Sequence, residues 1–154
     1  MHLAAQSANL EIVRFLVDNA AEKEAKQKYE FTPLHLAALD GHLDTVKFLV
    51  QKGAEKEAKT YEGDSTLHLA AKNGHLETVK FLVENGANTE AKENKGCTPL
   101  HFATQYGHLE TVQFLVKSKA NIDAKEKNDL TPLHLAALTA YLKMVALSSS
   151  ERQP

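Results

Sequence analysis

Thr32-Pro33-Leu34-His35-Leu36-Ala37-Ala38 is the stretch of sequence that decides the fold. Threonine favours a helix N-cap and proline favours the first helical position, so the stretch predicts a helix that begins at Pro33. His35 stands three residues after the cap, where a side chain can return a hydrogen bond to the capping residue. Gly41 can adopt the left-handed conformation found beyond helix ends, so the predicted helix is short.

The same stretch recurs along the chain at a fixed interval of 33 residues. Histidine occurs at positions 2, 35, 68, 101 and 134, and phenylalanine at positions 15, 48, 81 and 114. Residues 35–59 and 68–92 are identical at 18 of 25 positions. A fixed period of this size indicates a stack of repeats, in which each unit buries its apolar surface against its neighbours.

We expect a single domain of about five units. They fall at residues 1–25, 26–58, 59–91, 92–124 and 125–147, with the first and last incomplete and a polar tail at 148–154. Within a unit, a second helix is predicted from about Leu43 to Lys52. Its apolar residues are spread too widely for a helix with one buried face, as expected for a helix between two neighbouring units. The polar stretch 54–64 then predicts a projecting loop or hairpin.

These residues resemble the ankyrin repeat family. The resemblance rests on the motif at 32–38, its counterparts at 98–101 and 131–134, the variant Ser65-Thr66-Leu67-His68, and the short motifs Gly41-His42-Leu43, Phe48-Leu49-Val50 and Gly53-Ala54. It covers residues 2–147. It implies an all-α solenoid of helix-turn-helix repeats, with β-hairpin fingers nearly perpendicular to the helix pairs. It also implies that the hairpin tips and the concave inner face bind a partner protein.

The terminal units depart from this pattern. Ala8 and Ala140 replace the glycine that follows the first helix, and Met1 stands where the second unit has Leu34. A terminal repeat usually has a polar outer face, yet Leu3 and Phe15 in the first unit are apolar. We therefore expect the chain to be a segment of a longer array, with both ends fraying.

Composition narrows the class of protein. The chain has 154 residues, of which 43% are hydrophobic and 25% charged, as is usual for a globular protein. With 18 basic and 20 acidic side chains, the net charge of −2 argues against a nucleic-acid partner. No apolar run approaches the roughly 20 residues of a membrane span, and the N-terminus does not resemble a signal peptide. We expect a cytoplasmic monomer without membrane insertion.

The sequence predicts no catalytic, metal or cofactor site. Histidines one repeat apart are separated by roughly the 8–10 Å of packed helices, too far to share a zinc ion. Cys97 and His101 could form a nucleophile and its base, but no third residue is in place to orient them. We expect Cys97 to be an exposed, oxidisable thiol instead. Lysines at 26, 59, 92 and 125 alternate with acidic residues at 24, 57, 90 and 123, which predicts a solvated face of nearly balanced charge.

Candidate binding residues are those that differ between units, since scaffold positions are nearly constant within the chain. Differences concentrate at the hairpins and at the ends of the first helices, and the candidates are Tyr29, Phe31, Leu39, Asp40, Tyr61, Asp64, Lys72, Asn73, Lys95, Gln105 and Tyr106. Aromatic anchors often contribute about 2 kcal/mol or more to an interface. Alternatively, these positions vary only because they are exposed, and Phe31 packs under its hairpin.

The sequence as a whole predicts a non-catalytic protein-protein interaction module that presents a preorganised concave surface. The alternative is a structural spacer in a longer array, or a consensus-like scaffold without a specific partner. The close identity of the internal units favours this alternative.

Overall fold

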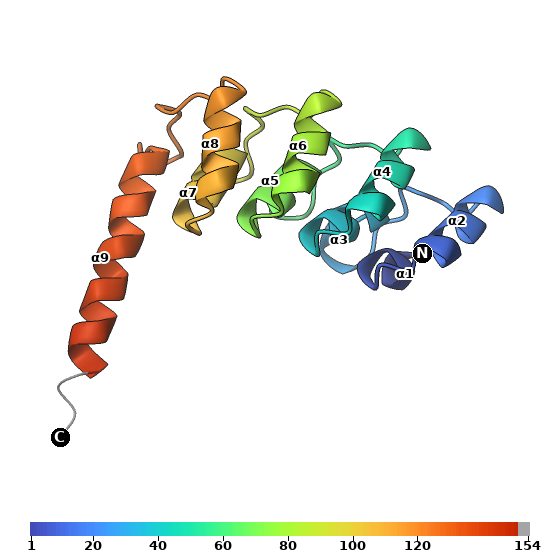
Figure 1. The fold of residues 1–154 in the computed structure, drawn as a ribbon, viewed down its shortest axis with the longest axis horizontal. Helices are drawn as coiled ribbons and strands as arrows, with labels where there is room; N and C mark the ends of the chain where they lie inside the picture. The colour runs from blue at the N-terminus through green and yellow to red at the C-terminus, as the bar shows by residue number, and fades with distance from the viewer. Residues whose placement is uncertain (151–154) are drawn as a thin grey trace.

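The computed structural model describes residues 1–150, and the side chains of residues 1–142. Its helices form two rows (Figure 1). The inner row contains α1 (His2–Gln6), α3 (Pro33–Leu39), α5 (Thr66–Lys72), α7 (Pro99–Gln105) and α9 (Pro132–Ser150). The outer row contains α2 (Leu10–Asp18), α4 (Leu43–Gln51), α6 (Leu76–Glu84) and α8 (Leu109–Lys117). Each helix packs on its neighbours in its own row, which confirms the predicted all-α repeat solenoid.

The predicted histidine caps are confirmed. In α3, the Thr32 hydroxyl accepts a hydrogen bond from the backbone N–H of His35, and the His35 Nδ1 atom accepts one from the backbone N–H of Thr32 at 3.1 Å. The same reciprocal pairs begin α5, with Ser65 and His68, and α7. Because two otherwise unpaired N–H groups are satisfied in each case, these seven-residue helices begin at fixed positions.

The core consists of the contacts between units. Leu36 is 4% exposed and Leu34 is 1% exposed in the second unit, whose inner helix α3 packs against α1 on one side and α5 on the other. Their equivalents Leu3 and Leu133 lie in the terminal units, where the inner helix has such a neighbour on one side only. Leu3 is consequently 79% exposed and Leu133 is 75% exposed. A single unit therefore has almost no apolar surface that it can bury alone.

The last unit differs from the others in its turn. Gly41 ends α3 with a φ of 75°, and Ala8 adopts a similar φ of 57° in the first unit. Ala140 instead lies within α9, which continues to Ser150, so there is no separate outer helix among residues 125–150. Leu109 and Val116 on α8 are exposed as a result. Part of the predicted polar tail belongs to α9, and residues 151–154 lie outside the described residues.

The loops between units are tight turns. Each is closed by two backbone hydrogen bonds, such as Thr60 N–H to the Asp64 carbonyl at 3.0 Å and Gly63 N–H to the Thr60 carbonyl at 2.9 Å. One loop contains the 3-10 turn η1 (Lys28–Glu30). Neighbouring loops are joined by a single backbone bond, as between Tyr61 N–H and the Tyr29 carbonyl at 2.9 Å. A single backbone hydrogen bond between two loops does not form a β-ladder. The loops form where predicted, but residues 1–150 contain no β-strand, so the prediction of β-hairpins is wrong.

The alternating lysines and acidic residues of the loops also connect neighbouring units, a role that the sequence analysis did not predict. Lys59 donates to the carbonyl oxygen of Lys92 at 3.3 Å, and Lys92 donates to that of Lys125 at 2.9 Å. The Glu57 carboxylate accepts from the backbone N–H of Asn88 at 2.9 Å. These side chains are solvated, as expected, but they also join one unit to the next.

None of the helices in residues 1–150 has the length and apolar character needed to cross a bilayer.

Candidate binding site on the inner surface

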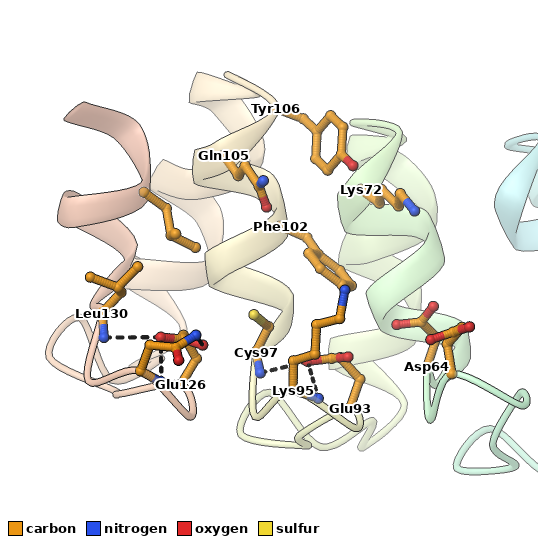
Figure 2. A pocket seen from close by; sticks show the side chains of 13 residues that line it. Asp64, Lys72, Glu93, Lys95, Cys97, Phe102, Gln105, Tyr106, Glu126 and Leu130 are labelled. Atoms are coloured by element: carbon orange, nitrogen blue, oxygen red, sulfur yellow. Dashed lines mark hydrogen bonds between the residues drawn. The ribbon is translucent and has the colours of Figure 1, made fainter. Parts of the chain in front are cut away.

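A pocket of about 470 Å³ lies on the inner side of the third, fourth and fifth units (Figure 2). Its walls are the loops of these units, the end of α5 and one side of α7. We call this the inner pocket. Of the predicted binding residues, the pocket brings together five: Asp64, Lys72, Lys95, Gln105 and Tyr106.

The other predicted residues lie outside the pocket, on the second and third units. They are Tyr29, Phe31, Leu39, Asp40, Tyr61 and Asn73. Tyr29 and Tyr61 are exposed on neighbouring loops. Phe31 is half-buried and packs edge-on against His35, with ring centroids 6.0 Å apart, which agrees with the alternative that it packs under its loop. The backbone carbonyl of Leu39 accepts from the Asn73 side chain at 2.7 Å.

The aromatic wall of the pocket is formed by Phe102 on α7 and by Tyr106, the residue that follows this helix. The Lys72 ammonium lies 5.7 Å from the centroid of Phe102 and 5.8 Å from that of Tyr106. At this distance the cation is attracted by both rings. The Phe102 ring packs edge-on against the ring of the buried His68, with ring centroids 5.6 Å apart. The aromatic wall is thus attached to the helix-capping system of the preceding unit.

Two buried glutamates form the floor. The Glu93 Oε1 atom accepts from the backbone N–H groups of Lys95 at 2.9 Å and Cys97 at 2.8 Å. Glu126 does the same in the fifth unit, for Asn128 at 2.8 Å and Leu130 at 3.1 Å (Figure 2). Each carboxylate therefore fixes its own loop while its charge faces the pocket.

The Asp64 carboxylate, unlike those of Glu93 and Glu126, accepts no hydrogen bond from the backbone of its own loop. In the third unit, the Thr60 hydroxyl accepts from the Asp64 N–H at 3.1 Å, so a neutral group replaces the glutamate. The Asp64 side chain is 7% exposed, and its Oδ1 atom has no hydrogen-bond partner. Burial raises the pKa of this carboxyl above its ordinary value; Lys72 opposes the rise, and Glu93 adds to it.

The prediction of an exposed thiol at Cys97 is wrong. The side chain is 8% exposed, because the loop that carries it folds against α7 and the Glu93 carboxylate. Burial, together with the Glu93 charge, raises the pKa of the thiol to about 12. Cys97 is therefore protonated at neutral pH and a weak nucleophile.

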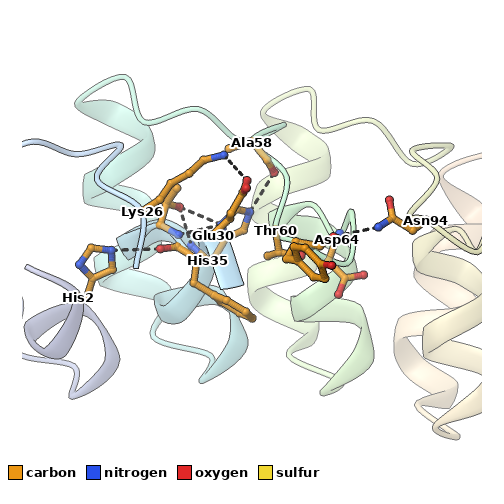
Figure 3. Close-up of polar contacts among 11 residues, drawn as sticks. His2, Lys26, Glu30, His35, Ala58, Thr60, Asp64 and Asn94 are labelled. Carbon is orange, nitrogen blue, oxygen red and sulfur yellow. Dashed lines mark hydrogen bonds and ion pairs between the residues drawn. The ribbon is translucent and has the colours of Figure 1, made fainter. Parts of the chain in front are cut away.

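Histidines at 2, 35, 68 and 101 join the inner helices α1, α3, α5 and α7 to loops further along the chain. Figure 3 shows the contact between the His35 ring and the carbonyl oxygen of Ala58, and the Nε2 atom lies 3.0 Å from that oxygen. A second set acts between units, since the His75 Nε2 atom lies 2.9 Å from the Leu39 carbonyl. Burial lowers the pKa of His35 and of His68 to about 4. Within the described residues, no three His, Cys, Asp or Glu side chains converge as a metal site would need.

The comparison of the repeat units with one another did not identify several residues that line the pocket, among them Glu93, Phe102, Glu126 and Leu135. A signal existed for Phe102, because the other units carry leucine at its position, as in Leu36 and Leu69. The two glutamates gave none, since nothing in a polar loop shows which of its carboxylates is buried.

The fold and the pocket together define a class of protein: a repeat solenoid with a rigid, chemically varied inner surface. The family model for ankyrin repeats, in three copies, matches residues 1–60 and 67–147. The chain belongs to the ankyrin repeat family. Members of this family are generally protein-protein interaction modules and are typically non-catalytic. No curated protein matches this chain.

Proposed function

We propose that this chain is a non-catalytic binding module whose partner protein lies across the inner surface, from the exposed tyrosines of the second and third units to the inner pocket. The observation that carries the proposal is the inner pocket itself. It places aromatic rings, two ammonium groups and four carboxylates around a volume of about 470 Å³, on elements that the fold holds rigidly. Such a mixture of anchors and charges suits a protein surface.

Rigidity supports this function. Phe102 rests against His68, Glu93 is held by two backbone N–H groups, and α7 begins at a reciprocal cap. Few side chains would have to be ordered when a partner binds. The entropic cost of association is correspondingly small.

The chemistry of the pocket supports binding over catalysis. Burial raises the pKa of the Cys97 thiol to about 12, so the thiol is protonated at neutral pH. His101, the candidate base, uses Nδ1 for the Thr98 N–H at 3.1 Å and lies 3.2 Å from the Leu130 carbonyl through Nε2. Both of its nitrogens therefore already have partners, and it has none left to take a proton from a nucleophile.

The test is capture of proteins from a lysate of the source cell, with the wild type and the Tyr29→Ala/Tyr61→Ala/Tyr106→Ala variant. Phe15→Ala is the matched control, because it removes an exposed aromatic side chain from the outer helix α2. All three proteins are first compared by circular dichroism. We expect a protein that is retained by the wild type and the control and lost by the triple variant.

Other outcomes would contradict the proposal. A protein retained equally by all three would place the binding surface elsewhere. If nothing specific is retained, the chain acts as a spacer or scaffold, the alternative favoured by the 18 identities in 25 positions between neighbouring units.

A further inference from the structure

We propose that the partner inserts a cationic side chain, arginine or lysine, into the inner pocket, where it pairs with the Asp64 carboxylate. This inference rests on the proposed function and specifies the chemistry of the partner segment. It follows from an unsatisfied buried group, from the charge balance of the pocket and from the place of Asp64 in the repeat.

Among the described residues that line the pocket, Asp64 has a buried acceptor atom without a hydrogen-bond partner. Its side chain is 7% exposed, it lines the pocket, and Oδ1 accepts no hydrogen bond. Leaving a buried acceptor unpaired costs about 1–3 kcal/mol, and more when it is charged. The Glu93 and Glu126 carboxylates avoid this cost through the backbone of their own loops. A donor that enters the pocket would find its strongest acceptor at Asp64.

The charges around the pocket favour a cation over other donors. Its lining contains the four carboxylates of Glu62, Asp64, Glu93 and Glu126, against the ammonium groups of Lys72 and Lys95. The excess is two negative charges when all are ionised. The ion pairs found among the described residues all involve other groups, so neither lysine neutralises Asp64 directly. The Lys72 ammonium lies instead 5.7 Å from the ring centroid of Phe102 and 5.8 Å from that of Tyr106.

The shape of the pocket suits a long side chain with a charged end. Phe102 and Tyr106 offer apolar surface along one wall, against which a methylene stem can pack. A guanidinium or ammonium group at the end of that stem would then reach the acidic loops. Each of these two cations gains more from a buried carboxylate than a neutral donor does.

The position of Asp64 makes the site specific to one loop. Its equivalents in the other units are Phe31, Cys97 and Leu130, none of which carries a charge. The cationic side chain is therefore accepted at one place along the array, and it would fix the register of the partner on the inner surface.

The inference is tested by NMR titration of the full chain with the capped pentapeptide acetyl-Gly-Gly-Arg-Gly-Gly-amide, up to about 20 mM, a range suited to a single weak contact. The matched peptide carries citrulline, which keeps the shape of arginine and removes its charge. We expect saturable shifts of the amides of residues 62–65 and 93–97 with the arginine peptide, and binding at least about tenfold weaker with the citrulline peptide.

Two variants accompany the titration. Asp64→Asn keeps the side-chain shape without its charge and is expected to weaken binding of the arginine peptide about tenfold or more. Asp44→Asn removes an exposed carboxylate from the outer helix α4, outside the pocket and outside the candidate binding residues, and is expected to leave binding unchanged. Equal binding of the two peptides, shifts centred elsewhere, no saturable shift, or undiminished binding by Asp64→Asn would overturn the inference.

The capture experiment separates this inference from the proposed function. If a protein is lost by the triple tyrosine variant but retained in full by Asp64→Asn, the module binds a partner and the inference about a cationic side chain is wrong. If no protein is captured, the proposed function fails, and the peptide titration still decides whether the pocket accepts a cation at Asp64.

Discussion

The Nε2 atom of His68 lies 3.0 Å from the main-chain carbonyl oxygen of Cys97, so one imidazole joins the inner helix of the third unit to the loop of the fourth. The Nδ1 atom of the same ring accepts from the Ser65 N–H at 3.2 Å. A ring that accepts at Nδ1 carries its proton at Nε2, and it can be neutral only. Protonation at Nδ1 would remove the acceptor of the Ser65 N–H, so the cap of α5 depends on the protonation state of this ring, whereas Nε2 can donate to the Cys97 carbonyl in either state.

The first prediction concerns acid. Burial lowers the pKa of His35 and His68 from 6.5 to about 4 in the folded chain, so the unfolded chain binds more protons between these values. The free energy of unfolding should be highest above about pH 6.5 and fall as the pH drops toward 4, by up to about 3 kcal/mol for each histidine. Urea unfolding at a series of pH values measures this.

A variant tests the assignment to these rings. His35→Gln is expected to be less stable at neutral pH, because it loses the bond to the Ala58 carbonyl, and to show a smaller loss in acid. A stability that stays constant from pH 7 to about 4.5 would contradict the prediction.

The second prediction is that Asp64→Asn stabilises the free protein at neutral pH, by about 1–2 kcal/mol, because it removes a buried charge without a partner. The folded state raises the pKa of Asp64, so its penalty is present above that pKa and disappears as the pH falls through it. The two proteins should therefore converge in acid. The exposed Asp40→Asn serves as control, with a change within about 0.5 kcal/mol. A loss of stability in Asp64→Asn would show that the carboxylate is satisfied.

The third prediction compares two glycines of similar backbone conformation. Gly53 has a φ of 80° and open space where a Cβ would lie, so Gly53→Ala should cost only the left-handed strain, about 1 kcal/mol. Gly41 has a φ of 75°, and a Cβ there would overlap the His75 ring. Gly41→Ala should cost about 2 kcal/mol more, since it also displaces the bond from His75 to the Leu39 carbonyl. Equal thermal shifts for the two variants would contradict this explanation.

The sequence predicted those parts of the fold that rest on local signals. The helices at 33–39 and 43–51 follow from the Thr32 cap, Pro33 and the glycines after each helix, and they agree with the structure to within a residue. The exposure of Tyr29 and Tyr61 also followed from their place in polar loops. The burial of Cys97 did not, because it depends on how a loop folds over the next helix.

The continuous α9 shows where such local signals are insufficient. Alanine replaces glycine at both Ala8 and Ala140, yet only the first adopts the turn. The difference lies in the following residue. The Asn9 side chain accepts from the Ile12 N–H at 3.2 Å and caps α2. The internal units have histidine at this position, which contacts a carbonyl of the preceding unit, whereas Tyr141 offers neither a short acceptor nor an imidazole. The pocket could not be predicted from local signals either. Its side chains come from three units, and they lie together because of the way the units stack on one another.

The last prediction is that Ala140→Gly with Tyr141→His restores the turn of the internal units. There, histidine follows glycine and bonds to a carbonyl of the preceding unit, as His108 does to Lys72 at 2.9 Å. The second half of α9 should then pack along α8 and cover Leu109, which is 66% exposed. Burying one such leucine contributes about 1.5–3 kcal/mol, so we expect a higher unfolding midpoint and slower amide exchange across 109–117.

Ala8→Gly is the matched control for this double variant, since the first unit already turns at Ala8 with a φ of 57° and gains only relief of backbone strain. Its stability should rise by about 1 kcal/mol, with exchange across 109–117 unchanged. If the double variant gains no more than this control, the exposed side of α8 results from the sequence after residue 142 and not from the missing turn.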